Sequence, residues 1–117
     1  MLKKLNTSSD KVLEYQVEGE VSAEEMRTAL RELKTVVEEQ GNINILVRAK
    51  DISESEYMKV VKDFVSDKEY FDKVNKYALV TDSKALATVE KLSGVLADLE
   101  YESFPLDKEE EARQWVR

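Results

Sequence analysis

The sequence contains neither cysteine nor histidine among its 117 residues. Without cysteine, the chain forms no disulfide bond and no thiolate metal site. Without histidine, it also lacks a common zinc ligand and the commonest general base of enzymes. These two absences remove the side chains of thiol, zinc and imidazole chemistry. The sequence therefore predicts a protein that is not an enzyme and that holds no metal ion and no cofactor.

Glycine and proline are scarce, with three glycines and one proline. The glycines at positions 19, 41 and 94 are isolated, so there is no glycine-rich phosphate loop. No apolar run approaches the roughly 20 residues of a membrane-spanning helix. No apolar segment of signal-peptide length follows Lys3 and Lys4. We therefore expect a cytoplasmic protein without an integral membrane segment.

Charge is abundant and mostly acidic. Hydrophobic residues make up 42% of the chain and charged residues 37%, which is typical of a globular protein with a strongly solvated surface. The length predicts a single domain over residues 1–117. The 25 acidic and 18 basic residues give a net charge of −7, and no run of Lys or Arg forms a basic patch. This balance disfavours a nucleic-acid partner. An acidic surface aids solubility or favours a basic partner.

The first half of the chain predicts a hairpin followed by a β-α-β unit. Strand-like residues 2–6 and 11–19 flank a polar turn at residues 7–10. Ser22 and Glu25 form a capping box, and an apolar stripe at helical spacing follows it before Gly41. Residues 43–50 are the most strand-like run of the chain. The crossover between residues 11–19 and 43–50 should be right-handed, so these two strands should be parallel.

The second half continues the alternation of helices and strands. Ser53, with Glu56 three residues later, begins a helix, and residues 66–69 repeat the capping pattern before a short helical piece with Tyr70, Phe71 and Val74. A short apolar strand at residues 77–81 precedes a third helix with Leu86, Val89 and Leu92. A strand at 101–104 and a capping box at 107–110 lead to a last helix that buries Ala112, Trp115 and Val116. The predicted order is β-β-α-β-α-β-α-β-α, an α/β fold with a mostly parallel sheet and an antiparallel N-terminal edge strand.

Three segments carry a resemblance to a known family: Leu13 to Val21, Ile45 to Asp51, and Tyr101 to Asp107 with Glu110, Ala112 and Trp115. They resemble the SpoIIAA-like group of the STAS family, in particular a branch of small bacterial STAS/Sec14-like proteins. The resemblance covers nearly the whole chain. It implies a SpoIIAA-like (β-α)n superhelix whose strands are adjacent in chain order.

Such a superhelix places its main helices on one face of the sheet. In the strand at residues 43–50, Ile43, Ile45, Val47 and Ala49 should then lie under the helices. The other face should be open, with Asn44, Leu46, Arg48 and Lys50 turned toward solvent or a partner. Arg48 is expected to pair there with polar residues of the strand at 11–19, namely Glu14, Gln16 or Glu18. An open face and exposed edge strands also predict a homodimer.

The loop that follows the strand at residues 43–50 is the candidate partner or switch site. STAS regulators of sigma factors carry a phosphorylatable Ser or Thr after an Asp and a Gly-Leu-Gly-type helix start. Here Asp51 is followed by Ser53 and Ser55, with no glycine, and Ser53 also suits a helix cap. We therefore predict a non-catalytic regulatory module that binds a protein partner through Asp51, Ser53 and Ser55 without the usual phosphoacceptor motif.

The alternative function is binding or sensing of a small apolar ligand or lipid, as Sec14-type relatives do. The pocket would lie between the second helix region and the sheet, lined by Tyr57, Val61, Phe64 and Phe71. The same aromatic spacing is also that of an ordinary core.

Asp51, Asp82 and Asp107 each follow a strand and should gather at one edge of the sheet. Three carboxylates there would suit Mg²⁺ or Ca²⁺, but each residue is also a natural helix start, which we favour.

Overall fold

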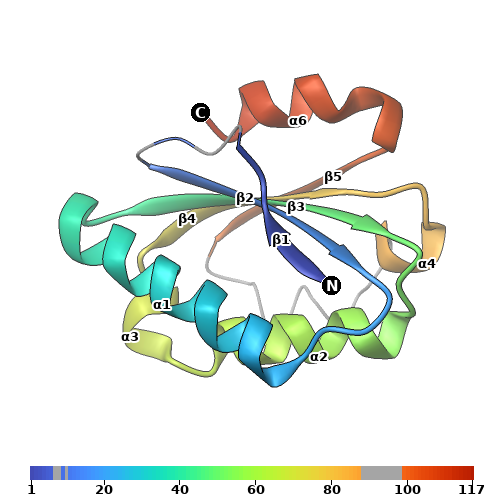
Figure 1. The fold of residues 1–117 in the computed structure, drawn as a ribbon. Helices are drawn as coiled ribbons and strands as arrows, with labels where there is room; N and C mark the ends of the chain where they lie inside the picture. Colours follow the sequence, from blue (N-terminus) through green and yellow to red (C-terminus); the bar gives the residue numbers. More distant parts are fainter. Residues whose placement is uncertain (7–8, 10, 88–98) are drawn as a thin grey trace.

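A five-stranded sheet forms the centre of the protein (Figure 1). The computed structural model describes residues 1–6, 9, 11–87 and 99–117. The strands run in chain order across the sheet: β1 (Leu2–Lys4), β2 (Val12–Glu18), β3 (Ile43–Lys50), β4 (Val74–Val80) and β5 (Glu100–Phe104). β1 pairs antiparallel with β2, and the other neighbours are parallel. The predicted α/β class, strand order and antiparallel edge strand are confirmed.

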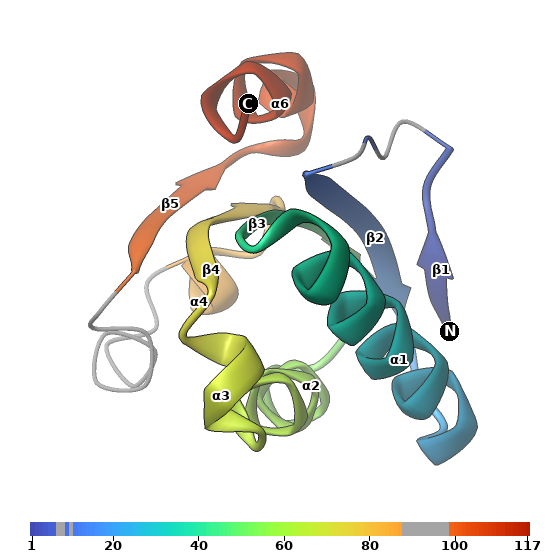
Figure 2. The same ribbon diagram turned by 90° about the vertical axis from the view of Figure 1, so that its left-hand side faces the viewer.

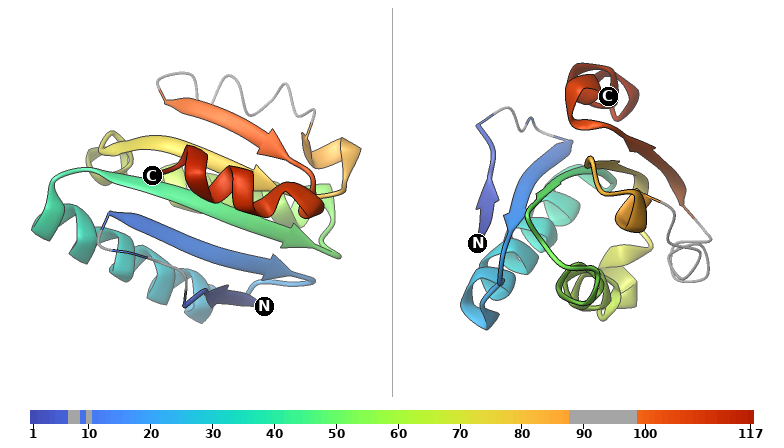
Figure 3. Two further views of the ribbon diagram at one scale, coloured as in Figure 1. Left: turned by 90° about the horizontal axis from the view of Figure 1, so that it is seen from above. Right: turned by 90° about the vertical axis from the view of Figure 1, so that its right-hand side faces the viewer.

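Helices cover both faces of this sheet (Figure 2). They are α1 (Ala23–Gln40), α2 (Glu54–Val65), α3 (Lys68–Phe71), α4 (Lys84–Ala87), the 3-10 helix η1 (Leu106–Lys108) and α6 (Glu109–Trp115). α1, α2 and α3 lie on one face, and α6 lies on the opposite face, above β3 and β4 (Figures 2 and 3). Within the described ranges, no helix is both long and apolar enough to cross a membrane.

The capping residues at both ends of α1 explain where this helix begins and ends. The Ser22 side chain accepts a hydrogen bond from the Glu25 amide at 3.1 Å, and the Glu25 carboxylate accepts one from the Ser22 amide at 3.0 Å. Gly41, with φ of 85°, follows the helix and donates its N–H to the Val37 carbonyl. A positive φ is cheap only for glycine, which is why the helix stops there.

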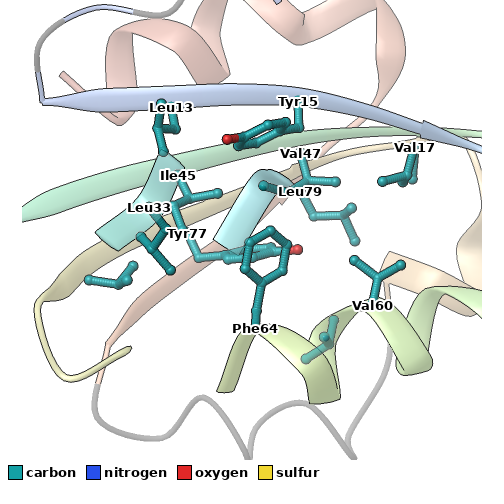
Figure 4. Packing of buried hydrophobic residues seen from close by; sticks show 14 of the residues in the cluster. Leu13, Tyr15, Val17, Leu33, Ile45, Val47, Val60, Phe64, Tyr77 and Leu79 are labelled. Atoms are coloured by element: carbon teal, nitrogen blue, oxygen red, sulfur yellow. The ribbon is translucent and has the colours of Figure 1, made fainter. Parts of the chain in front are cut away.

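The main core fills the space between the sheet and α1 and α2 (Figure 4). β2 contributes Leu13, Tyr15 and Val17, and β3 contributes Ile45 and Val47; all five are at most 2% exposed. The helical residues that face them share the spacing of one apolar stripe on each helix: Met26, Ala29, Leu33 and Val37 on α1, and Tyr57, Val60, Val61 and Phe64 on α2. The predicted inward face of β3 and the apolar stripe of α1 are thus confirmed.

The second face of the sheet is covered, which corrects the prediction that it is open. Leu46 was expected to point toward solvent or a partner, but it is fully buried beneath α6. It belongs to a second apolar cluster whose members come from three strands, α6 and the residue after α6: Val12, Leu46, Ala78, Val80, Ala112 and Val116. The reason is that the chain crosses to the other side of the sheet after β5 (Figure 2). The homodimer expectation rested partly on an open face, and it stays a prediction.

Two local predictions are also wrong. Val74 is not part of a helical piece but the first residue of β4. No capping box forms at Asp107: the turn Leu106–Lys108 is a 3-10 helix, and Lys108 precedes α6 without a side-chain cap hydrogen bond. The predicted turn at residues 7, 8 and 10 lies outside the described residues, as do Val89 and Leu92 of the third helix.

Candidate functional site

A pocket of about 360 Å³ opens at the carboxyl ends of β3 and β4, at the end of the sheet seen in the right-hand view of Figure 3. We call it the edge pocket. Its lining residues come from β3, the loops after β3 and β4, α4 and η1: Ala49, Lys50, Asp51, Ile52, Thr81, Asp82, Ser83, Leu86 and Leu106. β3 and β4 are adjacent and parallel, so the loops that follow them lie together. Ligands and partners of α/β sheets commonly bind at this end.

The first wall of the edge pocket is the turn at Asp51. Asp51 has φ of 47° and is the only non-glycine residue with positive φ in the described part of the chain. Aspartate tolerates this left-handed conformation better than most residues. The Gly19 amide donates a hydrogen bond to the Asp51 carbonyl at 3.0 Å, which ties the turn to the end of β2. The turn therefore holds an exposed carboxylate at the rim of the pocket.

The second wall joins the loops after β4 and β5. The Asp82 side chain accepts a hydrogen bond from the Leu106 amide at 2.9 Å, so one carboxylate links the two loops. The Ser83 amide donates to the Thr81 hydroxyl at 3.1 Å, and the Leu86 amide donates to the Ser83 hydroxyl at 3.3 Å. These hydrogen bonds fix the shape of this side of the pocket.

A second hollow of about 440 Å³ adjoins the edge pocket beneath α6. Gln16, Arg48, Lys50, Leu106 and Glu109 line it, so Lys50 and Leu106 belong to both. Arg48 donates to the Gln16 side chain at 2.8 Å and forms an ion pair with Glu109 at 2.9 Å. The prediction that Arg48 pairs with a polar residue of β2 is confirmed, and Glu109 of α6 is an additional partner.

An ion network connects α6 to the sheet and shares Glu109 with the second hollow. Arg113 contacts the carboxylates of Glu14 and Glu109 at 2.9 Å each and that of Glu110 at 2.7 Å. Arg113 is 8% exposed and Glu14 is 1% exposed. Sequence reasoning missed this network. The available signal was the spacing of Glu109 and Glu110 four and three residues before Arg113 on one helix.

Acid is expected to weaken this network. Burial tends to raise the pKa of Glu109, but hydrogen bonds from Arg113 and Arg48 outweigh it and lower the pKa below its usual value. A carboxyl with a lowered folded-state pKa adds stability above its unfolded pKa of about 4.3, and loses it as the pH falls through the folded value. Urea unfolding between about pH 7 and pH 3 should therefore show a shallower pH dependence for Glu109→Gln than for the native chain.

Glu39→Gln is the matched control, because Glu39 is exposed on α1, away from α6. It should keep the native pH profile. If Glu109→Gln followed that profile as well, the network would not contribute to acid sensitivity.

The candidate residues of the switch loop are not all in the pocket. Asp51 lines it, while Ser53 and Ser55 are exposed at the start of α2. Ser53 is the N-cap: its hydroxyl accepts a hydrogen bond from the Glu56 amide at 3.1 Å and lies 3.2 Å from the Ser55 hydroxyl. Glu56 accepts a hydrogen bond from the Val21 amide at 3.2 Å, and this bond lowers the pKa of its carboxyl. The start of α2 is thereby attached to the loop after β2.

Replacing Ser53 by alanine is expected to lower the free energy of unfolding by about 1 kcal/mol, because the Glu56 amide loses its cap. Ser55→Ala is the control and should change it by less than about 0.5 kcal/mol. Urea denaturation of both variants measures the difference. Equal values for the two variants would mean that the cap of α2 adds no stability.

The four candidate residues of the apolar pocket lie in or against the main core. Tyr57, Val61 and Phe64 are at most 3% exposed, and Phe71 packs against them from α3. The Tyr57 and Tyr77 hydroxyls are 3.0 Å apart and form a buried hydrogen bond. Burial, together with nearby phenols, raises the pKa of Tyr57 well above 10.0. None of the four residues lines the edge pocket.

The aspartates expected to gather at one edge do so in part. Asp51 and Asp82 both line the edge pocket, whereas Asp107 is exposed in η1 and does not line it. Among the residues that the structure describes, no group of three or more acidic side chains is placed to hold a metal ion. The contributions of Thr81, Ser83 and Leu106 were not predicted, although Thr81 ends a predicted strand and the other two follow one.

Comparisons with known proteins agree with this architecture. The SpoIIAA-like family model matches residues 12–117. Among solved structures, the chain is similar to an uncharacterized protein of the DUF3478 family with a SpoIIAA-like fold from Shewanella loihica PV-4. The TM-score is 0.65 at 12% sequence identity, over 100% of this chain and 93% of that one. No curated protein matches. The chain belongs to the SpoIIAA-like family.

Proposed function

We propose that this protein is a non-catalytic regulatory module that binds a protein partner. The contact surface is the edge pocket together with the first turn of α2, where Asp51, Ser53 and Ser55 lie. The observation that supports this most is the edge pocket itself. Its walls are fixed by backbone hydrogen bonds to Asp51 and Asp82, so it offers a partner a surface of defined shape.

The chemistry of the surface also favours recognition over catalysis. The side chains at the edge pocket are carboxylates, hydroxyls, one ammonium and aliphatic groups, and the chain has no histidine or cysteine to act as base or nucleophile. Ser53 is engaged as a helix cap. The interaction that we propose therefore does not depend on a phosphoserine at that position.

Site-specific photocrosslinking in the source cell tests the proposal. A photoreactive amino acid at position 54, exposed on the first turn of α2, would lie against the partner. The control is position 72, exposed after α3 at the opposite end of the strands. We expect a discrete crosslinked protein from position 54 and none from position 72. Absence of a product from position 54, or the same product from both, would contradict the proposal.

Charge reversal at Lys50, which lines the edge pocket, is a second and independent test. Lys50→Glu reverses an exposed charge at the edge pocket, and Lys3→Glu makes the same change of net charge on β1. The yield of the position-54 crosslink should change with Lys50→Glu and stay unchanged with Lys3→Glu. Equal effects would mean that only net charge matters and that the partner does not contact the edge pocket.

Binding of a small apolar ligand or lipid stays a prediction. Because Tyr57, Val61 and Phe64 are buried in the core, such a ligand would have to displace packed side chains. Native mass spectrometry of the purified chain tests it directly. A mass above 13.5 kDa that is lost on denaturation would support the ligand hypothesis over the partner hypothesis.

A further inference from the structure

We propose that the edge pocket receives a lysine or arginine side chain of the protein partner. This inference rests on the proposed function, and it names the chemistry of the group that would be recognised. Three features of the pocket carry it: an aliphatic floor, two carboxylates on different loops, and the sign of the charge around them.

The floor of the edge pocket suits the aliphatic stem of a long side chain. Ala49 and Leu86 are buried, and Ile52 and Leu106 are partly buried, so apolar surface lies between the polar walls. Lysine and arginine bury their methylene stems along such surface and keep the charged head near water. A fully apolar side chain would match the floor but would also remove water from the carboxylates at the rim, which is costly.

The rim supplies the acceptors for a cationic head. No described residue forms a hydrogen bond or an ion pair with the Asp51 carboxylate, and Asp82 uses one oxygen, Oδ1, to accept from the Leu106 amide. The two carboxylates come from the loops after β3 and β4: the Asp82 carboxylate is held by the Leu106 amide, and the Asp51 backbone is held by the Gly19 amide. The backbone positions of both residues are thus fixed before an ammonium or guanidinium group binds, which reduces the entropic cost of binding.

Charge complementarity decides the sign of the occupant. An acidic side chain in the pocket would meet Asp51 and Asp82 on a chain whose net charge is −7. Lys50 is the one cation among the described residues that line the edge pocket. It also lines the second hollow, where the carboxylate of Glu109 is another lining group. A basic partner is also drawn to the acidic chain from a distance, which raises the association rate at low salt.

Short peptides provide a defined probe. Acetyl-Ala-Lys-Ala-amide and acetyl-Ala-Arg-Ala-amide are titrated into the ¹⁵N-labelled full chain, with the norleucine and glutamate versions as matched controls. We expect saturable amide shifts at residues 49–52 and 81–83 with the lysine and arginine peptides only. Saturation should occur in the millimolar range, since exposed ion pairs contribute little free energy. No saturable shift up to the solubility limit, or equal shifts with norleucine, would overturn the proposal.

Two conservative variants test the carboxylates without disturbing the loops. Asp51→Asn suits a residue with φ of 47°, because asparagine also tolerates that conformation. Asp82→Asn keeps an oxygen that accepts from the Leu106 amide. Each should weaken binding of the lysine peptide about two- to fivefold. Asp107→Asn, which removes an exposed charge of η1 that does not line the pocket, is the control and should leave the affinity unchanged.

The outcomes separate this inference from the proposed function. If Asp107→Asn weakened binding as much as Asp51→Asn and Asp82→Asn, the effect would come from net charge, and the pocket would not recognise a basic side chain. If the peptides failed to bind while position 54 still crosslinked a partner, only the basic side chain would be excluded. If the peptides bound but no partner was crosslinked, the recognition chemistry would stand and the proposed function would fail.

Discussion

Replacing Arg113 with leucine is expected to lower the free energy of unfolding by about 3 kcal/mol. Arg113 brings a guanidinium against Glu14, a carboxylate that is 1% exposed on β2. Removing one member of a buried ion pair leaves the other charge in a site with little water, and this costs more than the pair itself contributes. Urea denaturation of the variant and the native chain measures the change.

Two further variants show whether the loss comes from the buried pair. The double variant Glu14→Leu/Arg113→Leu should be more stable than the sum of the two single losses predicts, because it removes both charges of the buried pair. Lys108→Ala breaks the exposed pair with Glu111, where both side chains are more than half exposed, and should change stability by less than about 1 kcal/mol. If Arg113→Leu cost no more than Lys108→Ala, the network would be a surface feature without structural effect.

The same network connects the stability of α6 to the candidate site. Glu109, which accepts from both Arg113 and Arg48, lines the second hollow and is the first residue of α6. Leu106, three residues earlier, lines both hollows, and its amide is held by Asp82. The turn that walls the edge pocket is therefore fixed at one end by the loop after β4 and at the other by α6.

Local signals in the sequence were sufficient for the first half of the fold. Ser22 and Glu25 form the predicted capping box, and α1 ends before Gly41, as predicted. Residues 43–50 are a strand over the predicted range. These features depend on residues within one turn or one strand of each other, where the physical rules relate spacing directly to structure.

The position of α6 could not be predicted from local signals, because it depends on contacts between residues far apart in the sequence. Glu14 and Arg113 are separated by 99 positions. On β2, Glu14 lies between Leu13 and Tyr15, which are buried on the other face of the strand. This alternation of polar and apolar residues is the same whether the carboxylate faces water or a guanidinium group. The prediction of an open face followed from a superhelix with its main helices on one side of the sheet, and this alternation agreed with it.

The sequence predicted where the candidate site lies better than it predicted which residues line it. The rule that partners bind beyond the carboxyl ends of parallel strands placed Asp51 and Asp82 correctly. It did not indicate Leu106, because the 3-10 turn after β5 brings that residue to the pocket, where a regular capping box was expected. Ser53 illustrates the opposite case, since its spacing to Glu56 identified the helix cap, and the structure confirms that role.

Replacing Leu46 with alanine is expected to lower the free energy of unfolding by about 2 to 4 kcal/mol. Leu46 is fully buried between the sheet and α6, where Ala112 and Val116 pack against the same apolar cluster. Truncation removes buried methyl groups and leaves a cavity that this small layer can fill only in part. A leucine on an open sheet face would instead change stability by less than about 0.5 kcal/mol when truncated.

Hydrogen exchange then shows where the lost stability lies. Amides of α6 are expected to exchange faster in Leu46→Ala, because the variant weakens the apolar contact that holds this helix. Phe64→Ala, on the other face, should cost about 3 to 5 kcal/mol and increase exchange mainly in α2 and its neighbours in the main core. A loss below about 0.5 kcal/mol for Leu46→Ala, with unchanged exchange in α6, would mean that α6 does not cover this face in solution.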